Sequence, residues 1–129
     1  MIGYARIETT DQAKATLFYD AILQPLDLIR VVKNPDNVDN APQPALDVIV
    51  FYVTRAFDQQ PSHYGNGVII AFAALRRAIV DQFHEIGVCS GGEHKGEPGP
   101  KPSGRPVYHA YLGDPTGNNI FGFNDCNIA

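Results

Sequence analysis

The chain has 129 residues, of which 44% are hydrophobic and 19% charged, and its net charge at neutral pH is −4. This length suits a single domain spanning residues 1–129, with a core of its own and an ordinary globular composition. The acidic balance argues against a nucleic-acid partner, which would need a basic face, and no apolar run approaches the roughly 20 residues that cross a bilayer.

The first predicted elements are a strand and a helix. Residues 2–8 alternate loosely between apolar and polar, as a strand does. Thr10 and Asp11 can accept hydrogen bonds from the free N–H groups of a helix start. The helix extends to about Leu23, because Pro25 cannot continue it. One face of this helix should be buried, and it consists of Ala15, Phe18, Tyr19, Ile22 and Leu23.

Strands are predicted on both sides of the middle of the chain. Residues 26–33 predict a strand, and the polar, proline-bearing segment 34–44 can only be a loop. Residues 45–53 are rich in β-branched and aromatic types and give the clearest strand. A glycine turn then precedes a short apolar run, 68–72, which predicts a buried strand.

The remaining elements are a second helix, a loop and a hairpin. The helix should span about 75–86, and Gly87 can end it in a left-handed conformation. Residues 91–100 are rich in glycine and proline and predict a loop. Residues 114–117, Asp-Pro-Thr-Gly, predict a turn between two strands. The buried face of the second helix should consist of Leu75, Ala78, Ile79, Phe83 and Ile86.

The second half of the chain repeats the first at an offset of 65 residues. This offset places Phe18 on Phe83 and Tyr4 on Ile69, so that helix falls on helix and strand on strand. Two units of about 1–57 and 65–125 would each leave one sheet face uncovered, and pairing them would bury that surface.

Three segments resemble the vicinal oxygen chelate superfamily, which includes glyoxalase I, bleomycin-resistance proteins, fosfomycin-resistance transferases and extradiol dioxygenases. They are GNG-x-x-x-AF at 65–72, GG-x-x-x-GEPGP at 91–100, and the DPxGN turn at 114–118 that follows Tyr108 and Tyr111. The resemblance covers nearly the whole chain. It implies an α+β fold in which two βαβββ modules in tandem form a cup-shaped mixed β-sheet flanked by helices.

In metal-bearing members of that superfamily, the ligands are a His on the first strand of each module and a Glu near the end of the last strand. A further ligand often comes from the last strand of the first module. The resemblance carries these positions onto Tyr4, Ile69 and Phe121, with Phe51 or Val53 as the further one. Three of these residue types have no electron pair to donate and tyrosine is an uncommon ligand, so we expect no metal or other cofactor.

Strand alternation extends the resemblance to the rest of the cup. Residues two apart face the same side, so His109 should accompany Tyr111, the position of the family's inward tyrosine. Aromatic walls favour a flat ligand, and a guanidinium favours an anionic one. The predicted lining consists of Tyr4, Arg6, Phe51, Ile69, Ala71, His109, Tyr111, Phe121 and Phe123.

These residues have simpler interpretations too. The phenylalanines and Ile69 could pack the cup solid, as side chains do in small barrels. Arg6 could pair with Glu8 at the rim of the sheet. His109 is the candidate for acid–base catalysis, with Tyr111 beside it, because histidine titrates near neutral pH. It could equally be a hydrogen-bonded core residue.

Other charged residues have weaker claims to a function. His63 and His94 lie in predicted loops, where they would be solvated. His84 lies near the end of the second helix, where a cation suits the helix dipole. Lys101 and Arg105 could close over an anionic ligand or could be surface charges.

Three functions remain open. The first is a metal-free small-molecule binder, like the bleomycin-resistance branch, and the resemblance implies a homodimer. The second is a metal-dependent glyoxalase-type lyase, isomerase or dioxygenase with non-standard ligands. The third is a metal-free enzyme in which His109 or Tyr111 transfers a proton. No secretory signal is visible, so we expect a cytoplasmic protein with Cys89 and Cys126 reduced.

Overall fold

The structure, a computed structural model, describes residues 3–31, 38–42, 50–55, 60, 67–100 and 107–125. Two βαβββ modules follow one another, which confirms the predicted fold class. Within these ranges, no helix is long and apolar enough to cross a membrane. The elements are β1 Ala5–Glu8, α1 Gln12–Leu23, η1 Gln24–Leu26, β2 Leu28–Val31, β3 Val38–Pro42, β4 Phe51–Thr54, β5 Ile69–Ala73, α2 Arg77–Cys89, β6 Glu93–Pro100, β7 Val107–Gly113 and β8 Asn119–Asp125.

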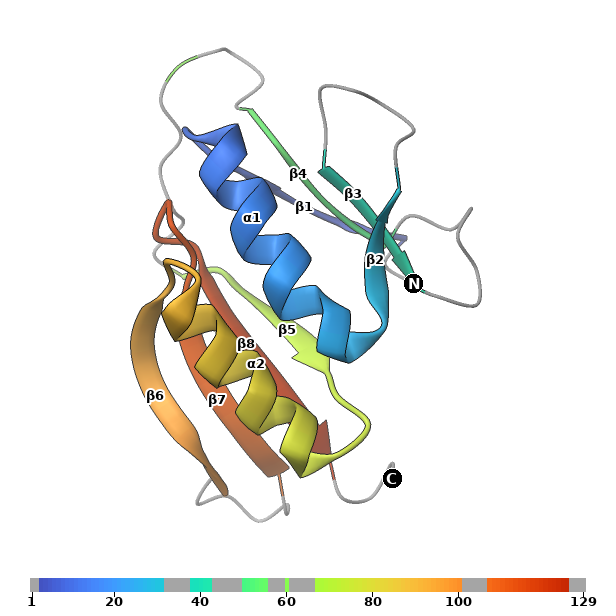
Figure 1. The fold of residues 1–129 in the computed structure, drawn as a ribbon, viewed down its shortest axis with the longest axis vertical. Coiled ribbons are helices and arrows are strands. Elements are labelled where there is room, and N and C mark those ends of the chain that lie inside the picture. The colour runs from blue at the N-terminus through green and yellow to red at the C-terminus, as the bar shows by residue number, and fades with distance from the viewer. Residues whose placement is uncertain are drawn as a thin grey trace.

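Each module builds one four-stranded mixed sheet. The strand orders are β1-β4-β3-β2 and β5-β8-β7-β6, so the modules have the same topology. In each sheet the first strand is parallel to the last and the remaining pairs are antiparallel. Helices α1 and α2 lie side by side on one side of the two sheets (Figure 1). We call the opposite side of both sheets the open face.

Helix α1 forms as the sequence predicts. The Asp11 side chain caps it by accepting a hydrogen bond from the Lys14 N–H at 3.1 Å. The helix ends at Leu23, and Pro25 lies in the 3-10 turn that follows. The buried residues are the five expected ones, Ala15, Phe18, Tyr19, Ile22 and Leu23.

Helix α2 begins and ends later than predicted. Leu75 precedes the helix and its side chain is 76% exposed, and Ala78 is also exposed, so neither belongs to the buried face. Val80, which the sequence analysis did not assign to that face, is fully buried together with Phe83. Ile79 and Phe83 of the predicted face are buried and Ile86 is partly buried, so the prediction is wrong only at the start of the helix.

Gly87 lies inside α2 and does not end it. The residue with a left-handed backbone is Gly91, with φ of 98°. Gly87 is buried against the sheet, and a Cβ there would collide with the side chain of Leu112. The glycine therefore permits close packing of helix on strand.

Two segments predicted as loops are strands. Residues 38–42 of the polar segment 34–44 form β3, which lies between β2 and β4. Residues 93–100 form β6 at the edge of the second sheet, with two irregularities in its register to β7. An edge strand tolerates prolines and glycines, because one row of its N–H groups needs no partner. Residues 45–49 of the predicted strand 45–53 lie outside the described residues.

A chain of aromatic rings joins the two modules through the core. Tyr19 on α1 lies 5.2 Å from Phe51, Phe51 lies 5.2 Å from Phe72, and Phe72 lies 6.2 Å from Phe83 on α2, between ring centroids. Each of these side chains is at least 93% buried. Such contacts contribute about 0.5–1.5 kcal/mol per pair beyond the buried area.

The buried carboxylate of Asp114 forms a second joint between the modules. Its Oδ1 accepts hydrogen bonds from the N–H groups of Thr116, Gly117 and Asn118, all at 2.9 Å. Its Oδ2 accepts from the Tyr19 hydroxyl at 2.7 Å and from Asn118 Nδ2 at 2.9 Å. Burial first, and then the charge of Asp114, raise the pKa of Tyr19 well above its ordinary value. The DPxGN turn is thus shaped and tied to α1 by one side chain.

Candidate functional site on the open face

The side chains of β7 and β8 alternate between the helices and the open face. Ile120 is fully buried on the helix side, and its neighbour Phe121 and the next odd residue, Phe123, lie on the open face. His109 and Tyr111 lie on the same face because they pair with Phe123 and Phe121 across the two strands. The predicted orientation of these four side chains agrees with the structure.

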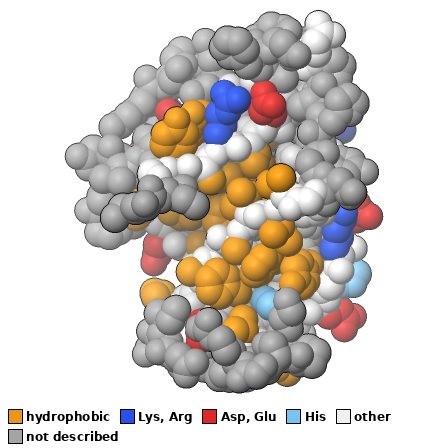
Figure 2. Space-filling view, turned by 180° about the vertical axis from the view of Figure 1, so that it is seen from behind, with side chains coloured by type: hydrophobic (Ala, Val, Ile, Leu, Met, Phe, Trp, Pro, Cys, Tyr) orange, Lys and Arg blue, Asp and Glu red, His pale blue; other side chains and the backbone are white. Residues whose placement is uncertain are grey.

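These four residues form a continuous group, which we call the aromatic cluster. The ring centroids of His109 and Tyr111 are 4.9 Å apart, and those of Tyr111 and Phe121 are 5.0 Å apart. Phe121 lies 5.8 Å from His109 and 5.9 Å from Phe123. All four are half-buried. Figure 2 shows hydrophobic side chains gathered on this side of the molecule, with a histidine at the edge of the group.

Strand β5 extends the apolar surface beside the cluster. Ala71 pairs with Phe121, and Ile69 lies two residues earlier on the same side. Ile69 is 44% exposed and Ala71 is also exposed, whereas Phe72, on the opposite, helix-facing side of β5, is buried. The aromatic side chains are therefore only partly covered, and they border an exposed apolar surface on β5.

His109 contributes a polar atom to this region, in addition to the hydroxyl of Tyr111. Its Nε2 is buried and has no hydrogen-bond partner among the described residues. A buried polar atom without a partner costs about 1–3 kcal/mol, so such atoms are rare in folded proteins. A ligand that presents a hydrogen-bonding group at this point would remove that cost.

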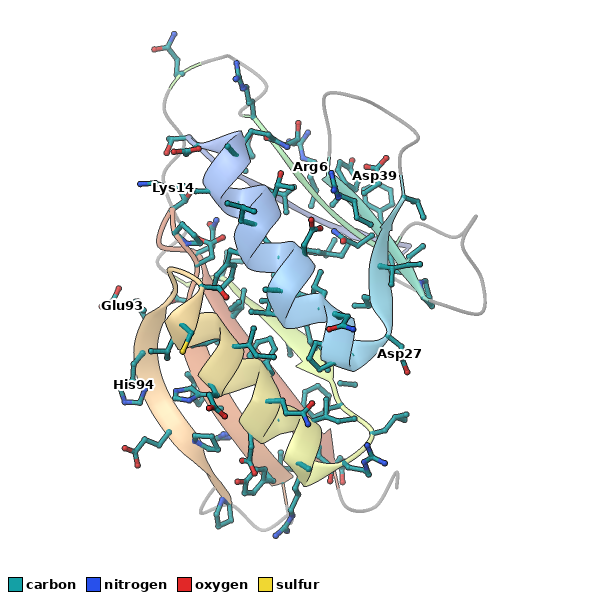
Figure 3. The ribbon with its side chains drawn as sticks, viewed as in Figure 1. Arg6, Lys14, Asp27, Asp39, Glu93 and His94 are labelled. Carbon is teal, nitrogen blue, oxygen red and sulfur yellow. The ribbon has the colours of Figure 1, made fainter. Side chains whose placement is uncertain are left out.

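The open face of module one is polar instead. Tyr4 and Tyr52 contact each other with ring centroids 5.2 Å apart, and Arg6 Nη2 lies 3.8 Å from Glu8 Oε2. The hydrogen bond between Tyr52 and Tyr4 is the largest cause of the raised pKa of Tyr52, burial adds to it, and Arg6 opposes it. Asp39 on β3 pairs with Tyr52 on β4, and Asp39 is buried. In Figure 3, Arg6 and Asp39 lie in the same part of this sheet.

Phe51 corrects the predicted lining. It is 2% exposed and lies in the core between Tyr19 and Phe72, on the helix side of β4. A shift of one residue moves a side chain to the other face of a strand. The open-face residue of β4 at this level is Tyr52, which pairs with Arg6. Both faces of β4 carry an aromatic residue, Phe51 on one and Tyr52 on the other, so alternation alone does not say which of the two faces the helices.

The predicted residues thus form two groups on one face. Tyr4 and Arg6 belong to the polar group of module one, and the remaining ones, apart from Phe51, belong to the apolar surface of module two. Tyr52 and Asp39 join the polar group and were not predicted. His63, Lys101, Arg105 and Cys126 lie outside the described residues. Cys89 is exposed and free.

The residues at the superfamily's ligand positions do not fit a metal ion. On the open face the first strands present Tyr4 and Ile69, and the last strands present Tyr52 and Phe121. Two of these have no donor atom, and the two phenols are uncommon ligands that do not replace the His and Glu set of metal-bearing members. In the described part of the chain, no three His, Cys, Asp or Glu side chains gather to hold a metal ion.

Comparison with known proteins gives a clear result for solved structures. No family model matches the sequence, and no curated protein matches it. A glyoxalase/bleomycin resistance protein from Albidiferax ferrireducens T118 has 30% sequence identity to the chain and a TM-score of 0.84, covering 96% of this chain and 98% of that one. A glyoxalase-related enzyme from Fulvimarina pelagi has 14% identity and a TM-score of 0.74, covering 97% and 88%. Lactoylglutathione lyase from Agrobacterium tumefaciens has 17% identity and a TM-score of 0.65, covering 96% and 92%.

Proposed function

The chain belongs to the glyoxalase/bleomycin resistance protein family of the vicinal oxygen chelate superfamily, and we propose that it binds a small, partly aromatic, anionic molecule on its open face without the superfamily's metal ion. The observation that carries this proposal is the aromatic cluster at the place where metal-bearing relatives need ligands. Phe121 there supplies an apolar ring and no donor atom.

The aromatic cluster favours a flat ligand. Its four rings are inclined to their neighbours at 46–68° and leave ring faces and edges on the half-buried surface. A planar ligand could contact several of them at once, and each such contact is worth about 0.5–1.5 kcal/mol beyond the buried area. The neighbouring Ile69 and Ala71 add apolar surface, which is the usual composition of a small-molecule site.

Arg6 favours an anionic group on the ligand. Its contact with Glu8 is long, at 3.8 Å, and both side chains are more than a third exposed. Such an ion pair contributes little, at most about 1 kcal/mol, so the guanidinium can exchange it for a ligand carboxylate or phosphate with which it makes two parallel hydrogen bonds. His109 Nε2 would bind a further polar atom of the ligand.

The binding proposal can be tested with 2-naphthoate as the probe and protein treated with EDTA. We expect changes in amide chemical shifts on β1, β5, β7 and β8, and affinity that added Mn²⁺, Fe²⁺ or Zn²⁺ does not alter. Phe121→Ala should weaken binding about tenfold, the equivalent of about 1.4 kcal/mol. Arg6→Gln should weaken naphthoate but not the uncharged 2-acetylnaphthalene.

Lys14→Gln is the matched control for Arg6→Gln, because it removes the same charge from α1 on the helix side (Figure 3). It should leave both affinities unchanged. The proposal fails if the chemical-shift changes map to the helix side, or if a metal ion is required for naphthoate to bind.

A second candidate function is metal-free proton transfer by His109, favoured by the unpartnered Nε2. A histidine next to a bound carbonyl compound can act as a general base. The test is exchange of the methyl protons of 2-acetylnaphthalene in D₂O with EDTA present, followed by NMR. Exchange that disappears in His109→Gln, while binding persists, would identify an enzyme; equal exchange with and without protein would leave only the binder.

We also propose that the protein is a homodimer. Exposed apolar side chains near the open face support this, since Tyr4, Val68 and Ile69 are 44–59% exposed. Val68→Asp should then shift the mass measured by light scattering toward that of a monomer. Leu17→Asp, on α1, is the control and should not. The exposed, free Cys89 fits a reducing compartment such as the cytoplasm.

A further inference from the structure

Two histidines meet away from the open face, on the outer side of module two. Nε2 of His84 on α2 lies 2.9 Å from Nδ1 of His94 on β6, and the two rings are inclined at 82°. The sequence predicts a loop at His94 and a position near the helix end for His84. Instead His94 is part of a strand and His84 lies in the interior of α2. Figure 3 shows His94 on β6, at the edge of the molecule.

Both imidazoles project from backbone that is anchored in the fold. Val80 and Phe83, on the turn of α2 before His84, are fully buried, so the helix cannot rotate freely. His94 is paired with Leu112 of β7, whose side chain is fully buried. Donor groups that are positioned before a ligand arrives bind it at lower entropic cost.

The separation of the two nitrogens matches a pair of adjacent ligands on one metal ion. Imidazole nitrogens bind such ions at about 2.0 Å. Two of them at right angles around one ion would lie about 2.9 Å apart, whereas a tetrahedral arrangement would separate them by about 3.3 Å. The observed 2.9 Å is the length of their hydrogen bond, and it shows that both nitrogens can reach one ion. Cu²⁺ and Ni²⁺ are the expected ions, because nitrogen ligands bind them most strongly among the divalent ions of the first transition row.

The charges around the pair suit a cation as well. The carboxylates of Glu97 and Asp81 both act electrostatically on His84. Asp81 also accepts a hydrogen bond from the Tyr108 hydroxyl at 2.5 Å, which fixes its position.

We propose that His84 and His94 form a surface site for a divalent cation of the Cu²⁺ or Ni²⁺ type, separate from the open face. The two imidazoles would replace their mutual hydrogen bond with bonds to the ion. Water molecules complete the coordination, because no third His, Cys, Asp or Glu side chain of the described chain joins the pair closely enough. The site does not depend on the ligand proposed for the open face.

The test is a Cu²⁺ titration of EDTA-treated and dialysed full-length protein, in competition with glycine, together with pulsed EPR. We expect one strong equivalent per chain and nitrogen couplings from two imidazoles. His94→Gln should weaken this binding by at least about tenfold, the equivalent of about 1.4 kcal/mol, and remove one imidazole coupling. His84→Gln should do the same.

The matched control is His109→Gln, which makes the same substitution on the open face. This variant should retain the strong equivalent and both couplings. Because His94 is exposed, His94→Gln should keep the amide spectrum of the folded protein. This variant therefore tests the metal site even if His84→Gln does not fold. Unchanged Cu²⁺ affinity in folded His94→Gln, or loss of the strong equivalent in His109→Gln, would overturn the proposal.

Discussion

The two modules have the same topology and different open faces. Each has the strand order first-last-third-second, counted within the module, with one helix behind it. Yet module one presents Arg6, Glu8 and two tyrosines, and module two presents the aromatic cluster. In each strand, alternate side chains face the helix and pack the core, and the others form the open face. A duplicated module can therefore keep its core residues while its open-face residues diverge.

The last strands of the two modules show this most directly. Phe51 on β4 and Phe121 on β8 both lie on strands that pair in parallel with the first strand of their module. Phe51 points into the core and Phe121 lies on the open face. The same residue type therefore supports stability in one module and forms a surface in the other.

The largest expected effect separates these two phenylalanines. Phe51→Ala should lower the free energy of unfolding by about 3–5 kcal/mol, because it empties a site that Tyr19 and Phe72 surround. Phe121→Ala should cost no more than about 1–2 kcal/mol, since its ring is only half-buried. Urea denaturation of both variants measures the difference. Equal losses would mean that the open face is packed as a second core.

The next effect concerns the joint between the modules. Asp114→Asn should lower the free energy of unfolding by about 2–3 kcal/mol, because the new amide NH₂ cannot accept the hydrogen bonds that one carboxylate oxygen accepted. Asp27→Asn is the control. Asp27 has a left-handed backbone, with φ of 59°, which asparagine also tolerates.

Thermal unfolding followed by circular dichroism would compare these variants. A single transition shifted to lower temperature in Asp114→Asn, with Asp27→Asn close to the wild type, is the expected result. Two separate transitions in Asp114→Asn would show instead that each module folds by itself and that the turn only links them.

Local patterns predicted the parts of the fold that depend on neighbouring residues. The buried face of α1 and its cap at Asp11 follow from spacing within one helix. The prediction was wrong where pairing partners decide the structure. Residues 38–42 and 93–100 become strands because they pair with β2, β4 and β7. A polar or proline-rich sequence gives no sign of a partner that lies elsewhere in the chain.

The candidate site shows the same limit. The orientation of the aromatic cluster could be predicted, because alternation within a strand links Phe121 to Phe123 and His109 to Tyr111. The side of β4 that Phe51 occupies could not, because the register of that strand depends on its pairing with β1 and β3. The contact of His84 with His94 depends on the packing of a helix on an edge strand.

A smaller effect is expected where the helix of module two approaches its sheet. Gly122 lies under the Phe83 ring, and a Cβ there would come within 2.9 Å of Phe83 Cδ1. In module one the matching position of β4 holds the larger Val53, which is fully buried. Gly122→Ala should therefore cost about 1–3 kcal/mol, since it overpacks the contact.

Gly99→Ala provides the control for this substitution. Gly99 also lies in a strand of module two, and a Cβ there would meet nothing within 4 Å. Its free energy of unfolding should change by less than about 0.5 kcal/mol. If both alanine variants lost equal stability, the cost would come from strand conformation rather than from the contact with Phe83.

The smallest effect tests Tyr19, which belongs to module one and donates a hydrogen bond to the turn of module two. Tyr19→Phe should cost about 1.5 kcal/mol at pH 8, because Asp114 loses one donor. The difference from the wild type should shrink above pH 10. Above pH 10 Tyr19 ionises in the unfolded chain. In the folded protein, burial and Asp114 raise the pKa of Tyr19 and keep it protonated. The wild type therefore loses about 1.4 kcal/mol of its free energy of unfolding per pH unit from this group, and Tyr19→Phe does not. Other tyrosines titrate in both proteins and cancel. Urea denaturation at several pH values from 8 to 11 measures the gap, and a constant gap would show that the Tyr19 hydroxyl is not held by the neighbouring module.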